Sequence, residues 1–437
     1  MRRARAARWA VLATGLAAAG LASAQRLDPR RPKTLVVGPP QGASPMHRVD
    51  AQRTGLSKAP LPSGTLRIAW KKTTAQTFDQ PALSASDGSL ALVSVRGDVT
   101  FLDEAGEESS TLRGGAQQAG PAVLTSDGTV VYTTGGGEAV GVQRGRQQPR
   151  FVTRIGGDRN ERRTAPLALN DGGVVVTTTT DLVALDAEGN VRSRTSLPEP
   201  PATPLLVSGD RVVAITTSGA VFGWAPGREA VRLGSFGAPV DGGAAIGLNG
   251  ALVAVIEGNH LAEVDLARGG RSTRAIAGQG LYLGPPAVRG PLVTLLALTQ
   301  TRGFVVTLDG AGQELVRAPI ATFNPAPLVD GGAPPLVAPP HVGVLVDARG
   351  AIAFAATDGA VGVVGPDGAV DTLGEMICAK ASRSGVVGLT PSGSGAFVVM
   401  CESGTVARIT GLAEARPKPA APVSSETTKL RPSPPER

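Results

Sequence analysis

The sequence has few of the residues that build metal centres. Its 437 residues include only three histidines, two cysteines and 3% aromatic residues. No pair of histidines has the spacing of metal ligands, and two cysteines add little to such a site. Charged residues are also scarce, at 18%, whereas hydrophobic residues reach 42%. This balance excludes a disordered chain.

Common catalytic motifs are also missing. The chain contains no Gly-x-Ser-x-Gly elbow and no His-Glu-x-x-His motif. The glycine clusters Gly114-Gly115 and Gly135-Gly136-Gly137 do not join a strand to a helix, so they are interpreted as turns rather than phosphate cradles. We therefore expect no enzyme activity and no catalytic, cofactor-binding or metal-binding residues.

Turn-forming residues, in contrast, are abundant. The chain has 58 glycines and 35 prolines. So many turn formers argue against a mainly helical protein and favour short strands joined by tight turns.

The N-terminus is typical of a secretory signal peptide. Four arginines among the first eight residues precede an apolar stretch from Trp9 to Leu21, and Ala22-Ser23-Ala24 provides the small residues of a cleavage site. This predicts a signal peptide over residues 1–24. An uncleaved membrane anchor is the alternative, although the apolar stretch is short for one. No cysteine lies near the cleavage site and no later segment is long and apolar enough to span a membrane, so we expect an exported protein, periplasmic or secreted, that is not a lipoprotein.

Charge is unevenly distributed along the chain. The formal charge of +7 includes the four arginines of the signal. Residues 25–64 carry seven basic and two acidic side chains, and residues 413–437 carry five and three, which leaves residues 65–412 mildly acidic. We predict an extended basic segment over 25–64, a folded body over 65–412 and a disordered Pro-rich tail over 413–437. The basic ends are interpreted as solvated tails, and an acidic body argues against nucleic-acid binding.

An internal repeat organises the body. The unit between Pro81 and Leu112 contains four short apolar or alternating runs separated by three tight turns. Its first turn recurs at eight places: Asp87-Gly88, Asp127-Gly128, Asp171-Gly172, Gly209-Asp210, Asn249-Gly250, Arg289-Gly290, Arg349-Gly350 and Ser392-Gly393. Most spacings are about 38–45 residues, typical of a four-stranded propeller blade. A longer gap around residues 323–340 is interpreted as a loop on one face.

The two ends of the repeat array are complementary. The last unit lacks its outermost strand, whereas Leu66 to Lys71 precedes the first complete unit. We predict an all-β closed propeller of about eight four-stranded antiparallel blades, in which the N-terminal strand with Leu66, Ile68 and Trp70 completes the last blade. Closure removes exposed strand edges and suits a monomer. A linear β-solenoid is the alternative, but it gives no reason for the split unit.

A second motif marks the third turn of several units. It reads Leu-Asp-x-x-Gly at residues 102–106, 185–189 and 308–312. Together with the segment from Met46 to Ser57 and the following Trp70, it resembles the pyrroloquinoline-quinone-type propeller superfamily over roughly residues 46–411. The resemblance implies an eight-bladed propeller.

The sequence departs from the quinone-dependent members of that superfamily. Those enzymes place a tryptophan under the cofactor, a bridge between adjacent cysteines beside it, and a calcium site with an acidic base; no stretch here supplies that set. Docking tryptophans after the third-turn glycine are also missing, so we expect the blades to pack mainly through Val, Leu, Ile and Ala.

A closer functional analogue is the propeller lipoprotein of the outer-membrane barrel-assembly machinery, which shares the blade count and an exported address and is not an enzyme. It implies an exported scaffold that binds a protein or peptide partner in the cell envelope. Two alternatives stay open: a divergent quinone-dependent oxidoreductase, and a carbohydrate-binding surface protein, against which the few aromatic residues count.

Two groups of residues are candidates for special roles. Cys378 and Cys401 are the only thiols, and an even pair in an exported protein suggests a disulfide, with two buried free thiols as the alternative. Arg159, Arg162 and Arg163 lie in a charged loop between two blades. That loop is either a recognition patch for the partner or a solvated connector.

Overall fold

The computed structural model describes residues 44, 46, 48–157, 163–247, 249–278, 280–299, 302–320, 342–356, 359–378, 385–393 and 395–412. The predicted signal peptide, the tail over 413–437 and the long inter-blade stretch over 323–340 lie outside these residues. The described part of the chain consists of strands and connections and contains no helix. Accordingly, it has no helix that is long and apolar enough to span a membrane.

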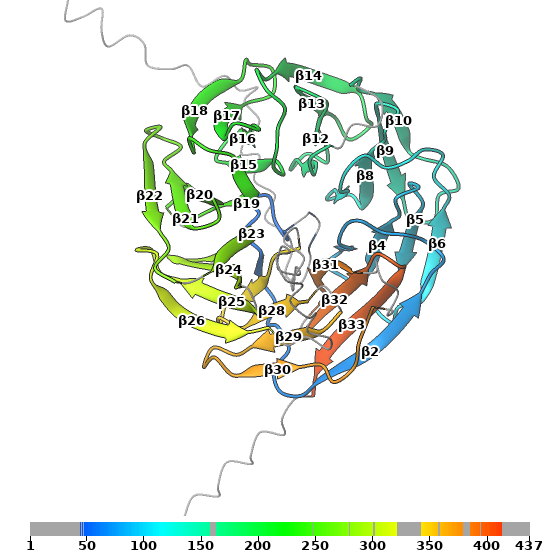
Figure 1. Cartoon of the computed structure of the whole chain (residues 1–437). Coiled ribbons are helices and arrows are strands. Elements are labelled where there is room, and N and C mark those ends of the chain that lie inside the picture. The colour runs from blue at the N-terminus through cyan, green and yellow to red at the C-terminus, as the bar shows by residue number, and fades with distance from the viewer. Residues whose placement is uncertain are drawn as a thin grey trace, which may run out of the picture. The chain divides into compact units, whose positions relative to one another are not determined.

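The strands form eight sheets arranged as a ring (Figure 1), which confirms the predicted all-β propeller. Each blade is one sheet. Blade 1 contains β3 (Leu83–Ser84), β4 (Leu90–Val93), β5 (Val99–Leu102) and β6 (Glu108–Leu112), and blade 2 contains β7 (Val123–Leu124), β8 (Thr129–Thr133), β9 (Glu138–Gln143) and β10 (Phe151–Arg154). Blade 3 contains β11 (Leu167–Ala168), β12 (Val174–Thr177), β13 (Asp181–Leu185) and β14 (Val191–Ser196), and blade 4 contains β15 (Leu206–Ser208), β16 (Arg211–Ile215), β17 (Ala220–Trp224) and β18 (Val231–Ser235).

Blade 5 contains β19 (Val240–Ile246), β20 (Leu252–Ile256), β21 (His260–Val264) and β22 (Arg271–Ala275), and blade 6 contains β23 (Leu281–Arg289), β24 (Leu292–Leu298), β25 (Gly303–Leu308) and β26 (Glu314–Pro319). Blade 7 contains β27 (Leu345–Asp347), β28 (Ile352–Ala355), β29 (Val361–Val364) and β30 (Val370–Thr372), and blade 8 contains β31 (Val386–Pro391), β32 (Ala396–Cys401), β33 (Thr405–Gly411) and β2 (Leu66–Thr73). A further strand, β1 (Leu56–Ser57), pairs with β27 in parallel and makes blade 7 five-stranded.

Burial follows the position of a strand within its blade. The middle strands β4 and β5 are buried along their whole length, because neighbouring blades cover both faces of the sheet. The outermost strand β14 alternates exposed and half-buried residues and reads Val-Arg-Ser-Arg-Thr-Ser. Apolar middle strands and polar outer strands are therefore what a radial stack of small sheets requires.

The repeated turn motifs have a local physical cause. The glycine of the first turn has a positive φ, +78° at Gly88 and +79° at Gly128, a conformation that side chains with a Cβ rarely adopt. In the third turn the aspartate accepts a backbone N–H four residues later, as Asp103 does from Glu107 (2.8 Å) and Asp186 from Asn190 (2.7 Å). These local bonds explain why Asp-Gly and Leu-Asp-x-x-Gly recur.

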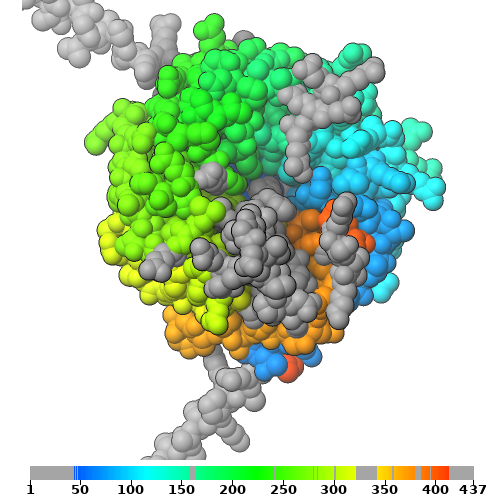
Figure 2. Space-filling model, viewed as in Figure 1, coloured from blue at the N-terminus to red at the C-terminus, as the bar shows by residue number. Residues whose placement is uncertain are grey.

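The N-terminal strand closes the ring as predicted. β2 pairs antiparallel with β33, from Leu66 opposite Gly411 to Thr73 opposite Thr405. Figure 2 shows the blue N-terminal and the red C-terminal segments side by side at the edge of the ring. Blades 8 and 1 also meet near the axis, where the Thr390 hydroxyl donates to the Ala82 carbonyl at 2.7 Å.

Aliphatic side chains fill most junctions between blades. One cluster, for example, joins Val, Leu and Ala side chains of blades 2, 3 and 4. The junction between blades 8 and 1 differs, because the Trp70 indole covers Gly106 of the third turn and donates its Nε1–H to the Glu104 carbonyl at 3.0 Å. Phe151 covers Gly189 in the same way between blades 2 and 3. Trp70 therefore docks two blades in addition to lying on the closing strand.

Candidate functional site

The axis of the ring has two different ends. Because the strands of a blade alternate in direction, all first and third turns lie at one end, which we call the turn end. The second turns and the segments that join successive blades lie at the other end, which we call the connection end. The innermost strands of the blades, such as β3, β7, β19 and β23, surround the axis and contact the inner strands of neighbouring blades.

The described residues between positions 44 and 61, namely 44, 46 and 48–61, lie at the turn end, and we call them the axial segment. Its carbonyl oxygens accept N–H bonds from the inner strands of four successive blades: Ala51 from Val207 (2.8 Å), Gln52 from Ile246 (3.0 Å), Thr54 from Val288 (2.8 Å) and Gly55 from Val346 (3.0 Å). Ser44 pairs with Ser84 of blade 1, and β1 continues the segment along β27. The segment thus caps inner-strand groups of most of the ring.

Two buried arginines strengthen this contact. The Arg53 guanidinium, 1% exposed, donates to the carbonyls of Leu205 (2.8 Å) and Pro166 (2.7 Å) in blades 4 and 3. The Arg48 guanidinium, 5% exposed, donates in the same way to two further inner-strand carbonyls, those of Val344 (2.5 Å) and Pro286 (3.0 Å). Each arginine therefore links two adjacent blades through charge-assisted hydrogen bonds.

Asp50 lies between the two arginines in sequence and shares their environment. Its carboxylate accepts the backbone N–H groups of Gln52 and Thr54, both at 3.0 Å, and the Thr54 hydroxyl at 2.5 Å. Although part of Asp50 reaches solvent, burial raises the pKa of this carboxyl, and the hydrogen bonds of Thr54 and the charge of Arg53 oppose that rise. Burial likewise lowers the pKa of Arg48 and of Arg53 to about 10, and Asp50 opposes both shifts.

These observations correct one expectation from the sequence. The basic residues of 25–64 were interpreted as part of a solvated tail, but Arg48 and Arg53 are buried at the axis. Net charge cannot reveal this burial, because the two guanidinium groups donate to backbone carbonyls of blades that are distant in the sequence.

A funnel opens at the connection end. It has a volume of about 560 Å³ and is lined by connections of blades 1 to 4 together with residues of blades 5 and 8. Its wall contains Pro81, Pro121, Pro201 and Pro204, and its exposed acidic residues are Asp79 and Glu402. Prolines fix φ, so the backbone of this wall is rigid. The sequence signal that could have revealed the funnel is the recurrence of proline just before the inner strands.

Gln80 holds two of these connections together beneath the surface. Its side-chain amide donates to the Val93 carbonyl at 3.1 Å and accepts the Ala122 N–H at 2.5 Å. The side chain is 2% exposed, so it positions the funnel wall rather than facing a ligand.

The predicted recognition loop is only partly described. Arg159 and Arg162 lie outside the described residues. Arg163 is 4% exposed, and its guanidinium donates to the carbonyls of Thr177 (3.2 Å) and Gly156 (3.1 Å). The Arg163 guanidinium therefore anchors the connection between blades 2 and 3. The recognition role of the loop stays a prediction.

A second hollow lies at the turn end, near the rim of blades 8, 1 and 2. We call it the rim groove. It consists of two adjoining pockets of about 710 and 420 Å³ that share Asp87, Ser89 and Arg144. The Ser89 hydroxyl donates to Asp87 at 2.6 Å and lowers the pKa of that carboxyl. Half-buried Trp70 forms part of the same wall.

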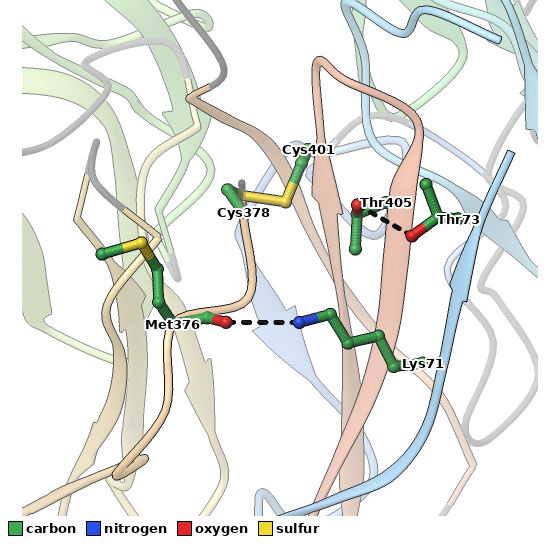
Figure 3. Close-up of a disulfide and its surroundings, with 6 residues drawn as sticks. All are labelled: Lys71, Thr73, Met376, Cys378, Cys401 and Thr405. Atoms are coloured by element: carbon green, nitrogen blue, oxygen red, sulfur yellow. Dashed lines mark hydrogen bonds between the residues drawn. A yellow bond between two sulfur atoms is a disulfide. The ribbon is translucent and has the colours of Figure 1, made fainter. Parts of the chain in front are cut away.

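The two cysteines meet at the closing blade. Cys378, in the connection from blade 7, and Cys401, at the end of β32, are joined by a disulfide in the structure, and both are buried (Figure 3). Lys71 of the closing strand donates to the Met376 carbonyl at 3.3 Å beside this bridge. The bridge therefore lies where the last connection meets blade 8, close to the closing strand.

The residues of the funnel do not fit a quinone cofactor of the kind the family resemblance implies. Trp70 lies at the rim, and Trp224 is fully buried with its Nε1–H donated to the Arg228 carbonyl at 2.9 Å. The cysteine pair lies outside the funnel and is separated by 23 positions. Among the described residues, no three His, Cys, Asp or Glu side chains gather as a metal site would need.

Comparisons with known proteins bear on the fold. No protein-family model and no curated protein matches the sequence. The structure is similar to BamB from Moraxella catarrhalis, with a TM-score of 0.58 and 16% identity over 80% of this chain and 99% of that chain. It is also similar to the computationally designed Ika8 protein, with a TM-score of 0.57 and 16% identity over 77% and 97% of the two chains. At these identities the similarity establishes the eight-bladed propeller fold and leaves function to the chemistry of the surface.

Proposed function

We propose that this chain is an exported, non-enzymatic β-propeller scaffold of the pyrroloquinoline-quinone-like type that binds a protein or peptide partner, with the funnel as the binding site. The observation that carries the proposal is the asymmetry of the axis. The chain's own axial segment occupies the turn end, whereas the funnel at the connection end presents rigid proline-rich walls. Concave sites on a rigid frame are where ligands bind most often.

The chemistry of the funnel suits an extended peptide with basic side chains. Asp79 and Glu402 are exposed at its surface, and the Arg163 guanidinium is directed into hydrogen bonds with the protein. A Lys or Arg side chain of a partner would therefore meet carboxylates. Such contacts steer association and weaken as salt increases. A role in envelope assembly is part of the proposal, because the assembly-machinery propeller shares the blade count and the exported address expected of this chain.

Two matched substitutions test the proposal. Ala202→Trp places a large side chain in the funnel, and Ala105→Trp does the same in the rim groove; both alanines are exposed. Tagged full-length protein is used to capture partners from extracts of the native cell envelope. We expect a reproducible partner with wild type and with Ala105→Trp, and its loss with Ala202→Trp. Asp79→Lys should weaken the same capture. Capture that survives both funnel substitutions, or no reproducible partner, contradicts the proposal.

A carbohydrate ligand is the second candidate, because the rim groove combines an aromatic face with polar side chains. The Trp70 indole lines the groove beside Asp87 and Arg144. Aromatic faces and hydrogen-bonding groups together are what a sugar ring requires. Strong hits on a glycan array that disappear with Ala105→Trp and persist with Ala202→Trp would favour this candidate over a peptide partner.

A further inference from the structure

The axial segment is bound through contacts of the kind that hold a peptide ligand. Apart from the bridge of Ser44 with Ser84 and the two residues of β1, its backbone does not continue a blade; instead its carbonyls are shared among the inner strands of blades 4 to 7. Its two arginines reach four further carbonyls in blades 3, 4, 6 and 7. An extended segment with side chains in fitted pockets is a common mode of peptide recognition.

Backbone strain is concentrated in this segment. Among the described residues, only four other than glycine have a positive φ, and three of them are Arg48 (61°), Val49 (76°) and Arg53 (56°). Such conformations are costly and persist only where the surroundings enforce them. The ring therefore imposes this shape on the segment.

A shaped cradle receives one of the arginines. A Cβ added to Gly55 would lie 2.3 Å from Nη2 of Arg48, and a Cβ added to Gly343 would lie 2.6 Å from its Nη1. Both glycines have a positive φ, +63° and +66°. Gly343 belongs to the ring and Gly55 to the axial segment itself, so both partners leave room for the Arg48 guanidinium.

We propose that the turn end of the axis is a peptide-binding site, specific for an extended segment with two arginines five positions apart, and that the axial segment occupies it in cis as a plug. The contacts across the axis hold the plug, rather than its covalent link to the closing strand β2. That link runs through Ser63 and Thr65, which are exposed. In the part of the chain that the structure describes, the axial segment thus occupies the turn end, and the funnel lies at the connection end.

Cutting the link in the folded protein tests the proposal. A site for a specific protease is inserted between Ser63 and Gly64 of the full-length chain, and the folded protein is cleaved. We expect the N-terminal fragment to remain bound in native mass spectrometry. A labelled synthetic peptide of residues 44–61 should then exchange into the site, and a peptide with Arg48→Ala and Arg53→Ala should compete at least tenfold more weakly. Release of the fragment from a ring that stays folded, or equal competition by the two peptides, would overturn the proposal.

A second measurement needs no cleavage. Hydrogen exchange at the amides of Val207, Ile246 and Val288 reports whether the axial segment is bound, because these amides donate hydrogen bonds to its carbonyls. Arg53→Ala in the full-length chain should speed exchange at these amides at least tenfold. The matched control is Arg67→Ala on the exposed face of β2, which should leave them unchanged. Equal exchange in both variants would refute the proposed role of the arginine.

Discussion

Removing the bridge between Cys378 and Cys401 should destabilise the closing blade by a calculable amount. The two residues are 23 positions apart, and closing a loop of that length reduces the entropy of the unfolded chain by the equivalent of about 3 kcal/mol. The replacement Cys378→Ala with Cys401→Ala removes this constraint and leaves two small apolar side chains in buried positions. We expect the folded ring to keep its strand pairing, so the substitution should lower the free energy of unfolding without changing the fold.

The loss of free energy of unfolding can be converted into a decrease in melting temperature. A propeller of roughly 350 residues has an unfolding entropy that converts 3 kcal/mol into about 4–5 °C. Differential scanning calorimetry of wild type and the double variant, both without reductant, measures this shift. Intact mass without reduction should show wild type lighter by two hydrogen atoms than the reduced chain, which establishes that the bridge is formed in the purified protein.

Reductant supplies the control. Both sulfur atoms belong to buried residues, so mild reductant should leave the folded wild type unchanged and should lower its stability to that of the double variant only when denaturant exposes the bridge. A double variant that melts within 1 °C of the bridged wild type would refute the reasoning, as would a wild-type mass that does not change on reduction in denaturant.

Two further predictions concern the axis and the blade junction. Burial raises the pKa of Asp50, so the stabilisation that its protonation contributes is present at low pH and is lost as pH rises above about 4, the usual Asp value. The melting temperature of wild type minus that of Asp50→Asn should therefore fall between pH 4 and pH 7, and a difference that is constant or rises contradicts the assignment. Trp70→Ala removes a half-buried indole and its hydrogen bond to Glu104, which should cost about 2–3 kcal/mol in urea unfolding; a change below about 0.5 kcal/mol would show that Trp70 does not dock the blades.

Much of the fold could be predicted from the sequence because its determinants are local. A glycine such as Gly88 is needed wherever a tight turn requires a positive φ, and an aspartate such as Asp103 caps the turn that follows. These needs recur in every blade, so they appear as a repeat. The split of the last blade was equally visible, because the strand missing from the last unit matches the surplus strand predicted from Leu66 to Lys71, which the structure extends to Thr73.

The candidate sites were harder to predict because distant blades build them. Arg53 is one of several basic residues in its stretch of sequence, and only the ring brings the carbonyls of Pro166 and Leu205 to its guanidinium. The surroundings of Arg163 were hidden for the same reason, since its partners Thr177 and Gly156 are brought to it by the folding of two blades.

The sequence by itself determined the architecture of this protein: an eight-fold β repeat closed by its N-terminal strand, since hydrogen-bonded turns and strand alternation act over a few residues. Only the tertiary structure decided which end of the axis the segment around Arg48 and Arg53 occupies. That choice depends on carbonyl groups that have no partner within their own blade, and no local pattern records where such groups converge.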